Sequence, residues 1–150
     1  MATYHNITKE EIESLLLPQK FLPMALPNTF ELVYGRRIDR NGMPLSLRIY
    51  TGIGASGNSR SKGTDAIRVN LFYRAAEGEK TYKIGGSKRV HRVKGWRQNL
   101  QSRIDDWLNT QVVKCDKCGK PMAIRKSQKG EFWGCIGYPD CKNTLSKEAA

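Results

Sequence analysis

Apolar residues recur along the chain at two spacings, which distinguish two expected helices from four expected strands. The segment Thr8-Lys-Glu-Glu11 fits a capping box, so a short helix should follow Thr8 and run to about Leu17, where Pro18 ends it. A second helix is expected over about 95–110, because its apolar residues fall on one helical stripe. This stripe consists of Trp96, Leu100, Ile104, Trp107 and Leu108.

Between these helices, apolar and polar residues alternate in four runs, a pattern typical of strands with one buried face. The runs cover residues 30–38, 45–53, 66–74 and 80–93. Asn41-Gly42 predicts a tight turn between the first two runs, and Gly85-Gly86 predicts a bulge or a break within the fourth. Residues 18–28 contain three prolines and should form an extended connection, whereas residues 54–63 are rich in Gly and Ser and should form a loop.

The alternation in the second and third runs assigns their residues to two faces of a sheet. The apolar face should form the core and consists of Leu45, Leu47, Ile49, Ile67, Val69, Leu71 and Tyr73. The other face combines arginines with aromatic rings: Ser46, Arg48, Tyr50, Arg68, Asn70, Phe72 and Arg74. Proteins often hold single-stranded nucleic acid in this way, with arginines on phosphates and rings on bases. The alternative is an ordinary solvated face with two exposed rings.

The formal net charge of +12 is concentrated in the middle of the chain. Between Arg36 and Arg103, sixteen Lys and Arg residues occur with four acidic ones, whereas the rest of the chain has ten of each. Nucleic acid is the usual partner of such a region. A membrane surface is a weaker alternative, because the basic residues lie in strand-like segments and not on an amphipathic helix. The candidate nucleic-acid contacts here are Arg48, Tyr50, Arg60, Lys62, Arg68, Phe72, Arg74, Lys88, Arg89, His91, Arg92, Lys94 and Arg97.

All four cysteines of the chain lie in its C-terminal third, as the close pairs Cys115/Cys118 and Cys135/Cys141. Two such pairs can bring four thiolates to one tetrahedral point, which suits a single structural Zn²⁺ ion. Two disulfides are the alternative, but the N-terminus has no secretory signal pattern and no run of about 18 apolar residues could span a membrane. We therefore expect a cytoplasmic protein with reduced cysteines that hold zinc.

The residues between and beside the cysteines form a recognisable motif. After Cys118 come Gly119 and Met122, and the second pair lies within Gly-x-Phe-Trp-Gly-Cys and Tyr-Pro-x-Cys. The segment, roughly 113–143, closely resembles the four-cysteine zinc ribbons at the C-terminus of bacterial type I DNA topoisomerases. In that family the ribbons bind single-stranded DNA, so the resemblance implies DNA binding but not topoisomerase activity. The candidate contacts in the ribbon are Arg125, Lys126, Phe132 and Trp133, and Trp133 is the ring most expected to be exposed for stacking.

These observations predict an α+β fold: a four-stranded antiparallel sheet flanked by an N-terminal and a C-terminal helix, followed by a small zinc ribbon. The expected domains are residues 1–111, a basic nucleic-acid-binding domain, and residues 112–150, the ribbon with a short tail. In element order the first domain is similar to the Whirly and Pur-alpha class of single-strand binders.

The function expected from these patterns is DNA binding without catalysis, with a preference for single strands. Its setting would be replication, repair, recombination or mobile-element DNA processing. A nuclease or nickase is one alternative, although the acids Asp39, Asp65, Glu77 and Glu79 lie in or beside expected turns and form no evident catalytic cluster. The other alternative is an adaptor whose ribbon docks a DNA-processing enzyme.

Overall fold

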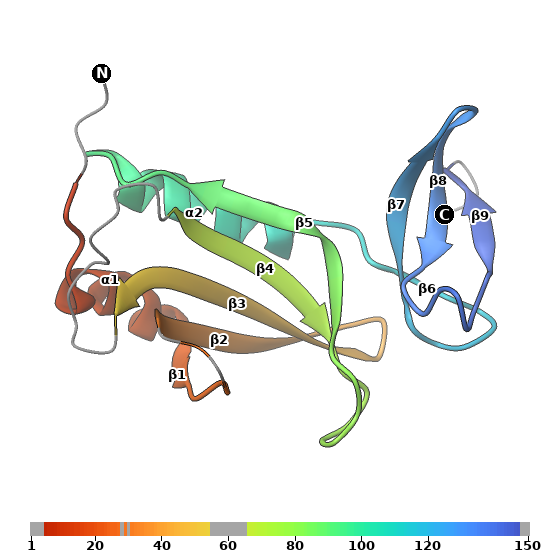
Figure 1. Ribbon diagram of the computed structural model, residues 1–150, viewed down its shortest axis with the longest axis horizontal. Helices are drawn as coiled ribbons and strands as arrows, with labels where there is room; N and C mark the ends of the chain where they lie inside the picture. The colour runs from red at the N-terminus through yellow and green to blue at the C-terminus, as the bar shows by residue number, and fades with distance from the viewer. Residues whose placement is uncertain (1–4, 28, 30, 55–65, 148–150) are drawn as a thin grey trace. The chain divides into compact units, whose positions relative to one another are not determined.

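The computed structural model of the chain describes residues 5–27, 29, 31–54 and 66–147. Arg60 and Lys62, two of the expected contacts, and most of the expected loop 54–63 lie outside these residues. The elements that precede the ribbon follow one another along the chain (Figure 1). They are α1 (Lys9–Leu16), the 3₁₀ turn η1 (Leu17–Gln19), β1 (Leu22–Met24), β2 (Glu31–Arg40), β3 (Met43–Gly54), β4 (Ile67–Tyr73), β5 (Tyr82–Val90) and α2 (Trp96–Leu108).

The chain packs as two compact units. One comprises Met1–Arg36, Leu47–Asn70 and Ser87–Asn109, and the other comprises Arg37–Ser46, Leu71–Gly86 and Thr110–Ala150. Strands β2 to β5 contribute residues to both units. The boundary expected between residues 111 and 112 therefore stays a prediction.

The sheet has five strands in the order β1-β2-β3-β4-β5, not the four that were expected. The additional strand, β1, lies in the proline-containing segment and pairs antiparallel with β2, where Leu22 is opposite Gly35. A Cβ atom at position 35 would lie 2.2 Å from Sδ of Met24, so a larger residue there would require the flexible Met24 side chain to move. An edge strand also tolerates Pro23, since one side of the strand needs no hydrogen-bond partner.

The turns follow the glycine signals, with one exception. Asn41 and Gly42 have φ angles of 51° and 77°, the left-handed conformations of a two-residue hairpin, and they join β2 to β3 as predicted. The expected break at Gly85-Gly86 does not occur, because β5 continues through both residues, and the bulge, the other predicted outcome, stays a prediction. Gly85 does take a φ angle of 66°, which most other residues adopt only under strain.

Burial follows the predicted alternation of the two faces along residues 43–50 of β3 and, except at the buried Asn70, along β4. In β3, Leu45, Leu47 and Ile49 are buried, whereas Arg48 and Tyr50 between and after them are partly exposed. The arrows of β3, β4 and β5 alternate in direction in Figure 1, as in an antiparallel sheet. The sheet and its helices therefore form an α+β body with an apolar core.

Hydrogen bonds connect both helices to the sheet. The Trp107 indole of α2 donates to the carbonyl of Val69 at 2.8 Å, and the Tyr34 hydroxyl of β2 donates to Glu13 of α1 at 2.7 Å. The apolar stripe of α2 is buried at Trp96, Leu100, Ile104 and Trp107. These contacts fix the helices over β2 and β4 and leave the opposite side of those strands to polar residues.

The capping box of α1 forms as predicted. The backbone N–H of Glu11 donates to Oγ1 of Thr8, and the backbone N–H of Thr8 donates to Oε1 of Glu11, each at 3.2 Å. The bond from the Thr8 backbone is the main reason that the pKa of Glu11 is lowered. The sequence pattern thus fixes the start of the first helix.

Candidate zinc centre and nucleic-acid interface

The C-terminal segment forms its own four-stranded antiparallel sheet in the order β6-β7-β8-β9. The strands are β6 (Val113–Lys114), β7 (Pro121–Ser127), β8 (Gly130–Cys135) and β9 (Thr144–Ser146). Cys115 directly follows β6 and Cys135 ends β8. β7 lies between β6 and β8, and its Met122 pairs with Val113 of β6 and with Cys135 of β8. This register brings Cys115 and Cys135 to the same end of the sheet.

The four sulfur atoms converge on one point. All lie within 4.8 Å of one another, with Sγ–Sγ distances of 3.7 Å for Cys115/Cys141 and 3.3 Å for Cys118/Cys135. A tetrahedral zinc with Zn–S bonds of about 2.3 Å places its sulfurs about 3.8 Å apart, whereas a disulfide requires about 2.05 Å. The cysteines are free thiols with the spacing that zinc requires. They form one zinc site, and four thiolates leave no coordination position for water or substrate.

Two glycines lie next to zinc ligands and have different roles. Gly119 has a φ angle of 79°, and its N–H donates to the Cys115 carbonyl at 2.9 Å, which closes the turn that carries Cys118. At Gly134 a Cβ atom would lie 2.8 Å from Cδ and Nε of Arg125, so the glycine leaves room for that side chain. The Arg125 side chain thus lies across β8 beside the zinc ligands.

Asn143 is a second-sphere residue that the sequence reasoning missed. Its Nδ2 donates to Sγ of Cys115 at 3.3 Å and to the Asp116 carboxylate at 2.8 Å. Burial acts to raise the pKa of Cys115, but hydrogen bonds from Asn143 and from the backbone of Cys118 outweigh it and lower the pKa to about 6. The only sequence clue was an amide side chain two residues after the last cysteine.

The aromatic residues of the ribbon are arranged differently from the prediction. Trp133 is only 8% exposed and packs in the ribbon core with Cys115, Met122 and Cys135, so the expectation of an exposed stacking ring at this position is wrong. Successive side chains of a strand point to opposite faces, so Phe132, the residue before Trp133 on β8, lies on the other face and is partly exposed. Tyr138, in the loop after β8, is the most exposed ring at 64%.

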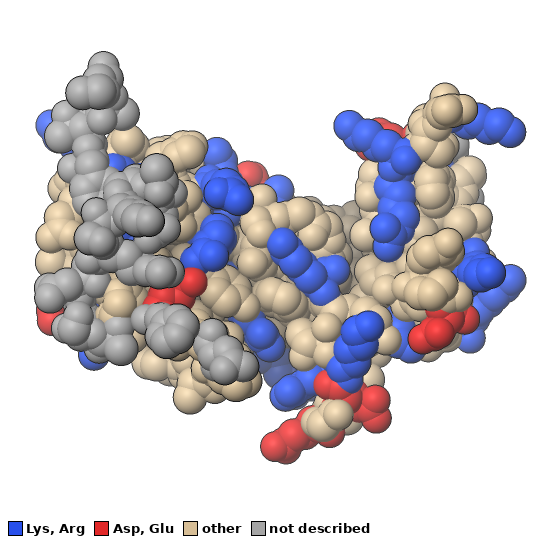
Figure 2. Space-filling model, viewed as in Figure 1, with Lys and Arg blue, Asp and Glu red and all other residues tan. Residues whose placement is uncertain are grey.

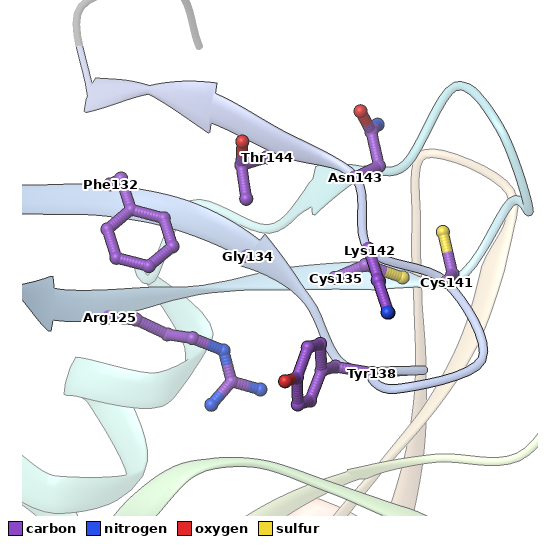
Figure 3. A pocket seen from close by; sticks show the side chains of 9 residues that line it. All are labelled: Arg125, Phe132, Gly134, Cys135, Tyr138, Cys141, Lys142, Asn143 and Thr144. Atoms are coloured by element: carbon purple, nitrogen blue, oxygen red, sulfur yellow. The ribbon is translucent and has the colours of Figure 1, made fainter.

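A cavity of about 320 Å³ lies beside the zinc centre on the face that Phe132 and Tyr138 share (Figure 3). Figure 3 shows the Arg125 guanidinium extending toward the Tyr138 ring, with Lys142 nearby. The lining residues are Arg125, Phe132, Gly134, Cys135, Tyr138, Cys141, Lys142, Asn143 and Thr144. This cavity therefore combines rings with positive charge. Lys126, the next candidate, is exposed on β7 and does not line it.

On and around the first sheet, most of the described residues expected to touch nucleic acid are at least partly exposed. Arg48, Tyr50 and Phe72 are partly exposed on the face opposite the core. Arg68 lies on that face too, but its guanidinium forms an ion pair with Glu31 and lies 5.4 Å from the centre of the Tyr50 ring. A further group is exposed around β4, β5 and α2 and consists of Arg74, Arg89, His91, Lys94 and Arg97.

Arg92, Lys88 and Arg97 also have contacts inside the protein. Arg92 is only 4% exposed and donates to the carbonyl of Thr51, so its role is structural and the expectation of a nucleic-acid contact is wrong. Lys88 places its ammonium 4.7 Å from the Trp107 ring. Arg97 pairs with Glu11 at 3.2 Å while remaining half-exposed. Figure 2 shows that Lys and Arg side chains nevertheless outnumber acidic ones over the visible face.

Within the described part of the chain, the four cysteines are the one group of three or more His, Cys, Asp or Glu side chains close enough to hold a metal ion. Asp65, one of the acids considered for a nuclease, lies outside the described residues. Neither helix that the structure describes is long and apolar enough to cross a membrane.

Comparison with known proteins identifies the ribbon. Residues 112–150 match the family described as topoisomerase DNA binding C4 zinc finger. A stretch of 75 residues is 37% identical to a protein described as DNA topoisomerase I, plasmid, from Xylella fastidiosa (strain 9a5c). It covers 50% of this chain but only 11% of that protein. No solved structure matches the chain, so the similarity in element order to the Whirly and Pur-alpha class stays an expectation. Residues 112–150 of this chain therefore form a topoisomerase-like zinc ribbon.

Proposed function

We propose that this protein binds single-stranded DNA without catalysing a reaction, using the ribbon cavity and the basic face of the first sheet. The setting we propose is cytoplasmic DNA processing, in replication, repair, recombination or mobile-element transfer. The family of the ribbon supports DNA as the ligand, and the surface chemistry of both sheets supports the preference for single strands.

The observation that carries the proposal is the cavity formed by Arg125, Phe132 and Tyr138. The partly exposed Phe132 and the exposed Tyr138 offer ring faces, and Arg125 and Lys142 bring positive charge to the same place. A base can stack on such a ring only where it is unpaired and unstacked, and each stacked base contributes about 1–3 kcal/mol. Duplex DNA would offer the cavity only phosphates.

The first sheet adds electrostatic attraction and further rings. Its basic residues displace counterions from the DNA, so affinity should fall steeply with salt. If about five phosphates of a single strand are contacted, log K against log salt should have a slope near −3.5. Tyr50→Ala and Phe72→Ala should each weaken single-strand binding by about 1–3 kcal/mol and change duplex binding less.

The test is a titration of labelled single-stranded, duplex and forked DNA and of RNA against the full chain at two salt concentrations. Tyr138→Ala should weaken single-strand binding most, and Arg125→Ala should follow it. Lys129→Ala is the control, because it removes a positive charge from the exposed turn between β7 and β8, outside the cavity.

Unchanged single-strand affinity in both cavity variants, with zinc still bound, would favour the adaptor function for the ribbon. Cleavage of the labelled strands during incubation with Mg²⁺ or Mn²⁺ would show that the protein is a nuclease and would contradict the non-catalytic proposal.

A further inference from the structure

The outer face of β4 carries polar side chains that the core does not account for. Arg68 and Asn70 lie two residues apart on the strand, so both side chains leave it on the same face. The residues between and beside them, Ile67, Val69 and Leu71, are fully buried on the other face. Arg68 and Asn70 thus belong to the face that carries Tyr50 on the neighbouring strand.

Both residues hold buried polar atoms that lack hydrogen bonds. Asn70 is 7% exposed, and neither its Oδ1 nor Nε of Arg68 has a hydrogen-bond partner. Leaving such an atom buried and unpaired costs about 1–3 kcal/mol, and folded proteins keep few of them. Two such atoms on one face of the strand set this place apart, and the unpaired Oδ1 of Asn70 fits a ligand that supplies a hydrogen-bond donor.

The surroundings define the shape of that ligand. Glu31 accepts hydrogen bonds from the Arg68 guanidinium and from the backbone N–H of Gly52, the latter at 2.8 Å. The Glu31 side chain is 11% exposed, so this carboxylate holds the guanidinium in place over the Tyr50 ring. A guanidinium plane held in this way offers a flat, charged surface on which a nucleobase can stack.

We propose that Arg68 and Asn70 form a base-reading site for one unpaired nucleobase. The base stacks on the Arg68 guanidinium, and small movements of the arginine stem admit its edge to the Asn70 carboxamide. The Watson–Crick edge of each base places a donor next to an acceptor, and only a single strand leaves that edge open. The site rests on the proposed single-strand binding and adds selectivity to it, because phosphate contacts alone do not distinguish bases.

The experiment measures binding of the full chain to labelled dA, dC and dT homo-oligonucleotides of equal length. One base-edge contact discriminates by about 1–3 kcal/mol, so the strongest and weakest oligonucleotides should differ by about 5- to 150-fold in affinity. Asn70→Ala should remove most of this difference and leave the salt dependence unchanged. Asn99→Ala, the same change at an exposed position of α2, should keep the difference.

Thermal unfolding of each variant establishes that it is folded. If Asn70→Ala does not fold, Arg68→Lys serves instead: it keeps the charge and removes the planar guanidinium, so the base preference should fall while the salt slope remains. Equal affinity of the wild-type protein for the three oligonucleotides, or a preference that survives in a folded Asn70→Ala protein, overturns the base-reading site. Absence of binding to all three overturns the proposed function itself.

Discussion

The ribbon and the helix-covered part of the first sheet are stabilised in opposite ways. Beneath α1 and α2, the core is built from large apolar side chains such as Trp96, Leu100 and Ile49, all fully buried. In the ribbon the buried cluster consists of Cys115, Met122, Trp133 and Cys135, and two of these four are zinc ligands. One region is therefore held by its own apolar surface and the other by a metal ion, which also fixes the cavity beside it.

The largest expected effect is loss of the metal. Structural zinc contributes on the order of 10–16 kcal/mol of apparent binding free energy in small peptides. Cys135→Ser should therefore unfold the ribbon while the first sheet and its helices stay folded. Zinc content and hydrogen exchange, followed by region, measure both outcomes. Cooperative unfolding of the whole chain in this variant would contradict the separation of the two stabilising mechanisms.

The converse change removes apolar surface beneath α2. Leu100→Ala should lower the free energy of unfolding of the first region by about 2–5 kcal/mol, because it leaves a cavity in a well-packed core. Denaturant unfolding measures this cost, and the zinc affinity should not change. Zinc loss that accompanies the destabilisation would show that the two regions depend on each other.

A smaller effect is expected from the hydrogen bond to a ligand sulfur. Asn143→Ala removes the side-chain donor to Cys115, and outer-sphere changes of this kind typically cost about 10- to 100-fold in metal affinity. Competition with a chelator measures this loss. Asn99→Ala, the same change at an exposed position of α2, is the matched control. Equal zinc affinities in the two variants would show that the hydrogen bond from Asn143 does not contribute to zinc binding.

The smallest effect concerns the start of α1. Thr8→Ala should cost about 1 kcal/mol, since it removes the N-cap. The lowered pKa of Glu11 means that this carboxylate stabilises the fold above its unfolded pKa and loses that contribution as pH falls through the folded pKa. Thr8→Ala removes the side-chain hydrogen bond to Glu11 but keeps the backbone one, so the acid limb of the stability profile should flatten only slightly. Complete loss of the acid limb in this variant would contradict the assignment of the pKa shift mainly to the backbone N–H of residue 8.

The sequence predicted correctly the helix start, the tight turn and the metal ligands, because each of these depends on residues that lie close together in the sequence. Thr8 with Glu11, Asn41-Gly42 and the cysteine pairs each specify geometry within a few residues. By contrast, β1 was missed because it is a three-residue strand that contains Pro23, and its pairing with β2 leaves no local sequence signal.

The errors at the candidate site have the same origin. Arg92 lies in a run of basic residues, which predicted a contact with nucleic acid. In the structure its guanidinium is buried and donates to the carbonyl of Thr51 on another strand. Trp133 and Phe132 are adjacent aromatic residues, and only the register of β8 determines which of them faces the ribbon core. The contact of Asn143 with the zinc centre is visible only in the structure, where its Nδ2 lies 3.3 Å from Sγ of Cys115.

The central claim is that both regions hold one DNA strand. Its most direct test is the affinity for a labelled single strand, long enough to span both regions, of the wild-type protein and of Cys135→Ser. Tethered contacts raise affinity by about 10²–10⁴ when both can engage, so the variant should bind more weakly by a factor in that range and still bind at low salt. Equal affinity of the two proteins at every salt concentration would contradict the claim, because the ribbon would then contribute nothing to DNA binding.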